Sequence, residues 1–206
     1  TFHLQNRAKK IQAIFCSLRF FMDNIIIIEE NIDVKPFLEE MDLDDWDWVS
    51  KQKGNNIGGN KNPYGFLPLV WAKVRKGEDP HDALGQGKTP LYDKYKNVQK
   101  FWERHNITKT GRAAFFRLKP GNSVGTHIDR GLYYKEKDRY HLSLQGTYLY
   151  TVGNQQMCVA PGTFFWFNNK IPHGAINVGD VDRYTLVWDV PHNKNNPHHL
   201  AWRKNS

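Results

Sequence analysis

A His-x-Asp step and one later histidine are the residues whose types and spacing best fit chemistry. His127 and Asp129 are separated by one residue. In a strand such residues point to the same face, so the imidazole and the carboxylate would converge on one point. A third ligand has to come from another strand, and His173 is the natural supplier. Two imidazoles and one carboxylate on one face of an octahedron leave other positions open, which favours iron(II). Taken alone, this spacing is a weak signal.

Arg183 follows His173 by ten residues and stands at the head of a predicted strand. A guanidinium that points into an apolar β barrel needs an anionic partner. The carboxylate of a cosubstrate would form a bidentate pair with it. The alternative is a surface arginine that pairs with Asp180 or Asp182.

A second group of polar residues alternates along one predicted strand. Arg139, His141 and Ser143 would share one face of it. If that face is interior, these residues add donors to the same cosubstrate pocket. In the alternative, Arg139 pairs with Glu136 or Asp138, and His141 is a hydrogen-bonded histidine of the core. The spacing leaves both possibilities open. Six other histidines of the nine lie in the N-terminal segment, loops, a helix end or the polar tail, and we expect them to be solvated.

The elements that must position these residues change in character near residue 110. After it, apolar residues alternate with a period of two, and turn residues such as Pro-Gly and Gly-Asn separate the segments. The predicted strands are Ala113–Leu118, Tyr140–Leu144, Tyr148–Val152, Gln156–Val159, Thr163–Phe167 and Tyr184–Val190. Many short strands at even spacing indicate an antiparallel barrel or jelly roll. Aromatic residues at Tyr148, Tyr150, Phe165, Trp166 and Trp188 are candidates for lining its interior.

The first half of the chain is predicted to be helical and irregular. Asp33 can cap a helix that runs to Met41, and further helices are predicted at 67–75 and 92–105. Ile25–Ile28 is interpreted as one buried strand. We expect the helices to cover one sheet, giving a single mainly β (α+β) domain.

This domain is predicted to comprise residues 22–110, the helical and loop part, and residues 111–191, the β core. Residues 192–206 form a polar tail. Residues 1–21 are expected to be a non-native or disordered extension, because Met22 resembles a natural start followed at once by a strand.

Composition narrows the class of protein. The chain has 206 residues and a formal charge of +8, of which residues 1–21 contribute four basic side chains and no acid. The remaining charge forms no dense basic block, so nucleic acid is not the expected partner. No apolar run approaches the ~20 residues that cross a bilayer. Cys16 and Cys158 are expected to be free thiols, which suits a reducing, cytoplasmic location.

Together the pieces resemble the aspartyl/asparaginyl β-hydroxylase family of 2-oxoglutarate oxygenases, which includes bacterial proline hydroxylases. The resemblance extends from Arg112 to Pro191 and rests on the order and spacing of several short segments. They are Phe116–Gly121, Thr126–Asp129, Arg139–Leu142, Ala160–Trp166, Pro172–Gly174 and Asp182–Arg183.

The resemblance implies a double-stranded β-helix (cupin) fold and an Fe(II)-dependent dioxygenase with 2-oxoglutarate as cosubstrate. It implies that iron is held by His127, Asp129 and His173. The cosubstrate would be bound by Arg183, helped by Arg139 and His141, with Ser143 on the same face. The enzyme would use O₂ to hydroxylate an aspartyl or asparaginyl side chain of a peptide or protein, or a free amino acid such as proline, releasing succinate and CO₂. Because Asp129 is present, a chloride-binding halogenase is disfavoured.

Three alternatives stay open. They are a catalytically silent cupin, a zinc-dependent cupin that binds a small ligand, and a 2-oxoglutarate oxygenase that acts on nucleic acid. The loops Gly54–Asn62, Gly77–Gly87 and Gly131–Lys137 are candidates for a substrate lid. Neither a particular substrate nor an oligomeric state follows from the sequence.

Overall fold

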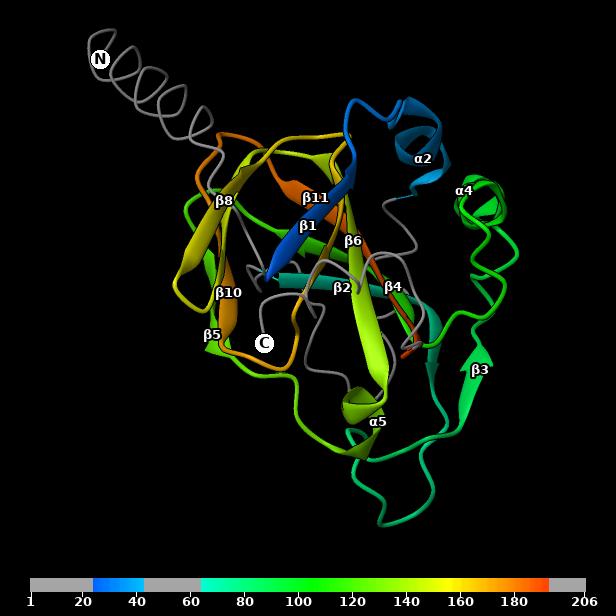
Figure 1. The fold of residues 1–206 in the computed structure, drawn as a ribbon. Helices are drawn as coiled ribbons and strands as arrows, with labels where there is room; N and C mark the ends of the chain where they lie inside the picture. Colours follow the sequence, from blue (N-terminus) through cyan, green and yellow to red (C-terminus); the bar gives the residue numbers. More distant parts are fainter. Residues whose placement is uncertain (1–23, 43–63, 193–206) are drawn as a thin grey trace, which may run out of the picture.

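A computed structural model describes residues 24–42 and 64–192 of the protein, which form two antiparallel β-sheets and three short helices (Figure 1). The seven strands of the large sheet are, in sheet order, β1 (Ile25–Glu29), β9 (Phe164–Phe167), β6 (Lys137–Gln145), β11 (Arg183–Pro191), β4 (Ala113–Leu118), β2 (Tyr64–Ala72) and β3 (Gln86–Lys88). The four strands of the small sheet are β5 (Ser123–His127), β10 (His173–Asn177), β7 (Tyr148–Val152) and β8 (Gln155–Val159).

The path of the chain from β4 to β11 is that of a double-stranded β-helix. Strands β4, β6, β9 and β11 belong to the large sheet, and β5, β7, β8 and β10 belong to the small one. The chain therefore passes repeatedly from one sheet to the other, and all observed pairings are antiparallel. This topology confirms the fold class predicted from the sequence.

The helices α2 (Lys35–Glu40) and α4 (Lys96–Arg104) cover the outer face of the large sheet (Figure 1). The ring of Phe101 on α4 lies 5.8 Å from that of Phe37 and 5.8 Å from that of Trp188 on β11. The third helix, α5 (Leu132–Lys135), follows β5 by a short loop. Burial of this outer aromatic cluster fixes which face of each large-sheet strand points between the sheets.

Strand β6 shows this division clearly. Tyr140, Leu142 and Leu144 belong to the core beneath the helices. Arg139 and His141 line a cavity between the two sheets. Because successive side chains point to opposite faces, Ser143 is on the inner face with them. The three residues share one face, as the alternation predicted, and of the two possibilities left open the structure shows the interior one.

The predicted strands after residue 110 correspond to β4, β6, β7, β8, β9 and β11, and β4 and β7 agree at both ends. The buried strand at Ile25–Ile28 is β1, and the helices predicted from Asp33 and from Tyr92 correspond to α2 and α4. Residues 1–21 and 54–62, and nearly all of the predicted tail, lie outside the described residues.

The helix predicted at 67–75 was wrong, because Tyr64–Ala72 is strand β2. This strand pairs with β4 on one side and with β3 on the other. Leu67 and Leu69 pack into the outer core, while Phe66 packs on the opposite face with Ala114. A strand buried on both faces is apolar throughout and carries no period of two, so its pattern does not separate it from a buried helix.

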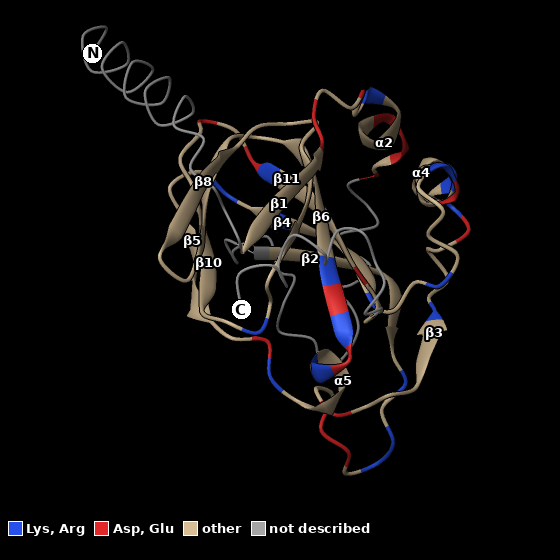
Figure 2. Cartoon of the chain, viewed as in Figure 1, with Lys and Arg blue, Asp and Glu red and all other residues tan. Residues whose placement is uncertain are grey.

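Charged side chains of both signs are interspersed along loops, helices and strand ends (Figure 2). Within the described residues, no helix is long and apolar enough to span a bilayer.

Candidate functional site

Three side chains from different parts of the β core meet at one end of the space between the sheets. His127 is the last residue of β5, and it is paired in register with His173, the first residue of β10. The Nε2 atoms of both histidines lie 3.9 Å from Oδ1 of Asp129. The three ligand atoms are all within 4.8 Å of one another. One imidazole comes from each strand, and the carboxylate comes from the loop between β5 and α5. The expectation that His127 and Asp129 share the face of a single strand was wrong, because β5 ends at His127.

Both imidazole rings are oriented by backbone carbonyls. Nδ1 of His127 is 2.9 Å from the carbonyl oxygen of Gly125, and Nδ1 of His173 is 2.9 Å from that of Ile171. A carbonyl oxygen only accepts, so each Nδ1 carries a hydrogen, and Nε2 is the ring nitrogen that faces Asp129 and is placed to bind a metal. Burial lowers the pKa of His173 to about 4, against the attraction of Asp129. His173 is therefore neutral at neutral pH, as a metal ligand has to be.

The carboxylate of Asp129 is oriented from its other oxygen. Oδ2 accepts from Nη1 of Arg139 at 2.9 Å and from Nδ2 of Asn169 at 3.3 Å. Oδ1 is the oxygen that faces the two imidazoles. Arg139 in turn donates from Nε to Oδ1 of Asp189 at 2.7 Å. The partners of Arg139 are thus Asp129 and Asp189, rather than Glu136 or Asp138, the acids named as the alternative.

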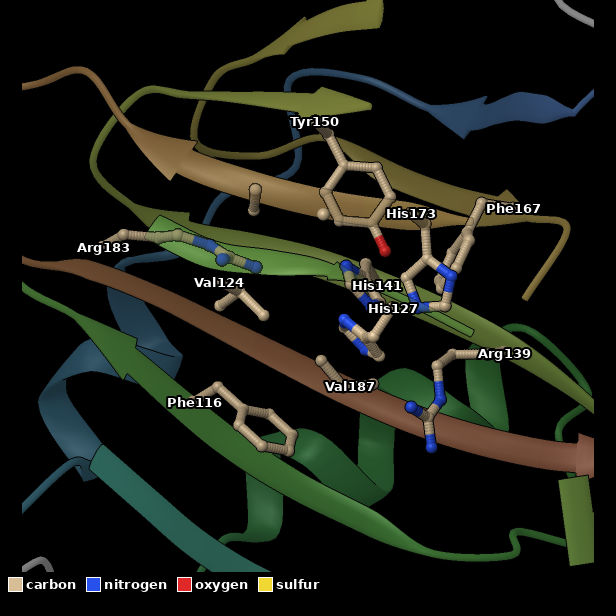
Figure 3. Close-up of a pocket in the computed structure, with 12 residues that line it drawn as sticks. Phe116, Val124, His127, Arg139, His141, Tyr150, Phe167, His173, Arg183 and Val187 are labelled. Atoms are coloured by element: carbon tan, nitrogen blue, oxygen red, sulfur yellow. The ribbon is translucent and has the colours of Figure 1, made fainter. Parts of the chain in front are cut away.

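A cavity of about 110 Å³ extends between the sheets from the two histidines to Arg183 (Figure 3). It is lined by Phe116, Val124, His127, Arg139, His141, Tyr150, Phe167, His173, Gly174, Ala175, Arg183 and Val187. The side chain of His127 is 45% exposed at one end, whereas that of His173 is 3% exposed. The cavity is therefore open to solvent on the His127 side and closed at Arg183.

Arg183 is a buried cation at the closed end. It is 4% exposed, its guanidinium lies 4.0 Å from the centre of the Tyr148 ring, and its Nε donates to the Thr185 hydroxyl at 2.8 Å. No carboxylate of the described residues pairs with it, so the ion pair with Asp180 or Asp182 is not formed. A buried guanidinium without a counterion is costly unless a ligand supplies one.

Two more polar groups on the inner face of β6 are available to a ligand. Nδ1 of His141 and Oγ of Ser143 are buried and have no hydrogen-bond partner among the described residues. Burial and the positive charge of Arg183 hold the pKa of His141 well below its usual range, so this imidazole is neutral. Each unsatisfied buried group costs about 1–3 kcal/mol. A ligand rich in oxygen atoms would recover that cost.

The aromatic residues proposed for the interior divide between two faces. Tyr150 lines the cavity, and Tyr148 and Phe165 pack between the sheets. Trp166 and Trp188 belong to the outer core under α4, so their assignment to the interior was wrong. Each lies an odd number of positions along its strand from a residue whose side chain points between the sheets, so its own side chain points to the outer face.

Hydrogen bonds and a close backbone approach join the two segments that flank the open end of the cavity. The Leu132 backbone N–H donates to Oδ1 of Asp82 at 2.8 Å. Gly131 has φ of +103°, and a Cβ there would lie 2.4 Å from the carbonyl oxygen of His81. Arg112 donates to the carbonyl oxygen of Ala83 at 3.0 Å. Two of the loops suggested as lids, Gly77–Gly87 and Gly131–Lys137, therefore contact each other next to Asp129. Together they are called the rim.

Two residues that support Asp129, directly or through Arg139, were missed by the sequence reasoning, namely Asn169 and Asp189. Asp189 had a usable signal, because it lies an even number of residues from Arg183 on the same strand and so shares its face. Asn169 follows β9 in a loop and carries no such signal.

Known proteins place the chain in context. The family model described as aspartyl/asparaginyl β-hydroxylase matches residues 85–193, just over half of the chain. No curated protein matches significantly. Among solved structures, a predicted oxalate decarboxylase (tm1287) from Thermotoga maritima is similar with a TM-score of 0.37 and 18% identity, over 61% of this chain and 92% of that one. The Cnp3 cupin domain of Schizosaccharomyces pombe is similar with a TM-score of 0.35 and 14% identity, over 39% of this chain and 56% of that one.

Proposed function

Because this chain belongs to the aspartyl/asparaginyl β-hydroxylase family, we propose that it is an Fe(II)- and 2-oxoglutarate-dependent dioxygenase. Its substrate would be an aspartyl or asparaginyl side chain, or a free amino acid such as proline. One observation carries the proposal: a His-Asp-His cluster stands at one end of a cavity, and a buried arginine that pairs with no carboxylate of the described residues stands at the other. Such a cavity suits a ligand that reaches from a metal to a cation.

The residues present fit both groups. Iron(II) would be held by Nε2 of His127, Nε2 of His173 and Oδ1 of Asp129, the two-histidine, one-carboxylate set that leaves positions open. When bound, iron(II) and 2-oxoglutarate together supply the activation of O₂, with succinate and CO₂ as products. The fixed Nδ1 hydrogen bonds hold both imidazoles in the ligating tautomer.

The cosubstrate would be anchored at the closed end. Arg183 would pair with its distal carboxylate, and His141 and Ser143 would donate hydrogen bonds to its oxygen atoms. The cavity, at about 110 Å³, is smaller than the ~300–1,000 Å³ of pockets for drug-sized ligands. It therefore suits a short dicarboxylate, and the larger substrate would approach from the solvent side, past His127.

The first experiment is anaerobic visible absorption of the protein with iron(II), before and after 2-oxoglutarate is added. We expect a charge-transfer band that requires both. The band should disappear in Asp129→Ala and in His173→Ala, which remove one ligand each. His105→Ala is the matched control, because His105 pairs with Glu29 away from the site, and it should keep the band.

The alternatives give different results in the same experiment. Metal bound without a band would indicate a silent or zinc-dependent cupin, and no bound metal would remove the site. If the band forms, succinate release in the presence of single amino acids and of peptides containing Asp or Asn tests the substrate class. Absence of succinate with every member of that panel would contradict the proposed hydroxylase.

A further inference from the structure

A buried series of polar side chains connects helix α5 with Asp129. The Tyr133 hydroxyl donates to Oδ2 of Asp189 at 3.1 Å. Arg139 donates to both oxygens of Asp189, from Nε at 2.7 Å and from Nη2 at 3.1 Å. The remaining Nη1 of Arg139 lies 2.9 Å from Oδ2 of Asp129. All three nitrogen atoms of this guanidinium are therefore engaged by two carboxylates.

Asp129 needs such support because of where it lies in the fold. It follows β5 and precedes α5, so no strand pairing holds its backbone. A carboxylate on a loop rotates readily about its side-chain bonds, and both of its oxygens are equivalent as metal ligands. Contacts from Arg139 and Asn169 to Oδ2 remove that freedom and leave Oδ1 facing the two imidazoles.

Asp189 holds Arg139 in place. Its side chain is 1% exposed, and that of Arg139 is 14% exposed. Two parallel hydrogen bonds between a guanidinium and a carboxylate fix the plane of both groups. Arg139 is thus oriented from the side opposite Asp129, and the direction of its Nη1 depends on Asp189.

Tyr133 holds Asp189 from the rim. Its hydroxyl accepts from the Arg112 backbone N–H at 2.7 Å, so its hydrogen is directed to Asp189. Its ring lies 3.9 Å from the Arg112 guanidinium and is fully buried. Burial and the nearby charge of Asp189 raise the pKa of this hydroxyl, so it stays protonated and remains a donor.

We propose that Tyr133, Asp189 and Arg139 are positioning residues that hold the carboxylate of Asp129 in its ligating orientation, and that they connect the metal centre to helix α5 on the rim. Arg139 would then support the metal ligand Asp129 in addition to lining the cavity. The inference rests on the proposed function, since it requires that Asp129 binds a metal.

The test uses cobalt(II) as the probe, because its visible absorption reports ligand geometry without turnover. The 206-residue chain and its variants are titrated with Co(II), and both the affinity and the visible spectrum are recorded. Asp189→Asn removes the charge that orients Arg139, and we expect Co(II) to bind about 10- to 100-fold more weakly, as for other supports of metal ligands. Tyr133→Phe removes one hydrogen bond, and we expect about a 5-fold loss. Both variants should change the visible spectrum.

The neighbouring Tyr134→Phe is the matched control. Tyr134 is also buried and its hydroxyl also accepts from Arg112, at 3.3 Å, but it makes no contact with Asp189. Its ring, which lies 4.7 Å from the Arg139 guanidinium, is retained in Phe. We expect Co(II) affinity and spectrum as in the unmodified protein.

The two proposals fail differently. If the unmodified protein binds no Co(II), the metal site of the proposed function is wrong, and the positioning role falls with it. If it binds Co(II) and both variants bind with unchanged affinity and spectrum, only the positioning role is wrong. Should Asp189→Asn fail to fold, the comparison of Tyr133→Phe with Tyr134→Phe decides alone.

Discussion

Replacement of Arg183 by methionine should weaken the binding of 2-oxoglutarate without lowering the stability of the ligand-free protein. Methionine has a similar length and no charge. In the described structure the guanidinium is 4% exposed, donates a hydrogen bond to Thr185 and pairs with no carboxylate. Removal of a buried cation that pairs with a ligand carboxylate costs about 3 kcal/mol of binding free energy. The affinity for 2-oxoglutarate should therefore fall about 150-fold. Without ligand, removal of an uncompensated buried cation should leave the free energy of unfolding unchanged or raise it by up to about 2 kcal/mol.

Two assays measure these quantities. Anaerobic titration of the iron(II)-loaded protein with 2-oxoglutarate, followed by the absorption band, gives the affinity, and chemical denaturation of the metal-free protein gives the stability. Arg117→Met is the control, because Arg117 is on the paired strand β4 beside Tyr184, and it should bind 2-oxoglutarate normally. If Arg183→Met binds 2-oxoglutarate normally, or unfolds more than about 2 kcal/mol more easily, Arg183 is structural and the reasoning is refuted.

Three further outcomes are expected. The folded-state pKa of His173, about 4, lies below the usual 6.5, so the unfolded chain binds this proton more tightly. The free energy of unfolding of the metal-free protein should therefore be highest above about pH 7 and fall by about 3 kcal/mol as the pH drops to about 4. Chemical denaturation at a series of pH values measures this, and a free energy of unfolding that does not change with pH would contradict it. Gly131→Ala should destabilise the protein by about 1–3 kcal/mol, since its φ of +103° is strained for alanine and the new Cβ would clash with His81; thermal unfolding against Gly125→Ala, where a Cβ meets nothing within 4 Å, provides the comparison. His141→Leu removes a buried nitrogen without a partner, so the ligand-free protein should lose no stability while 2-oxoglutarate binds about 10-fold more weakly; equal binding would show that His141 does not contact the cosubstrate.

The inner-face residues were the most predictable part of the site. Arg139, His141 and Ser143 were placed together because β6 alternates strictly, and the helices on the outer face bury the intervening residues. Arg183 was placed at the head of its strand for the same reason. Alternation is a local property, so it is visible in one sequence.

The partners of those residues were not predictable. Asp129 lies outside the strand, and its orientation depends on Arg139 and Asn169, which are brought to it by two other parts of the fold. The engagement of Arg139 with Asp189 requires the pairing of β6 with β11. Such contacts join residues up to 50 positions apart, and no single-sequence pattern records which of several acids a guanidinium will meet.

Strand β5 also has a mechanical consequence for the whole domain. It is one of the two terminal strands of the small sheet, and within the described residues it pairs only with β10. Its last residue and the first residue of β10 are the two histidines of the site. An ion shared by them would link β5 to β10 and close the chain between residues 127 and 173 into a ring. Loading the site would then oppose the separation of β5 from β10.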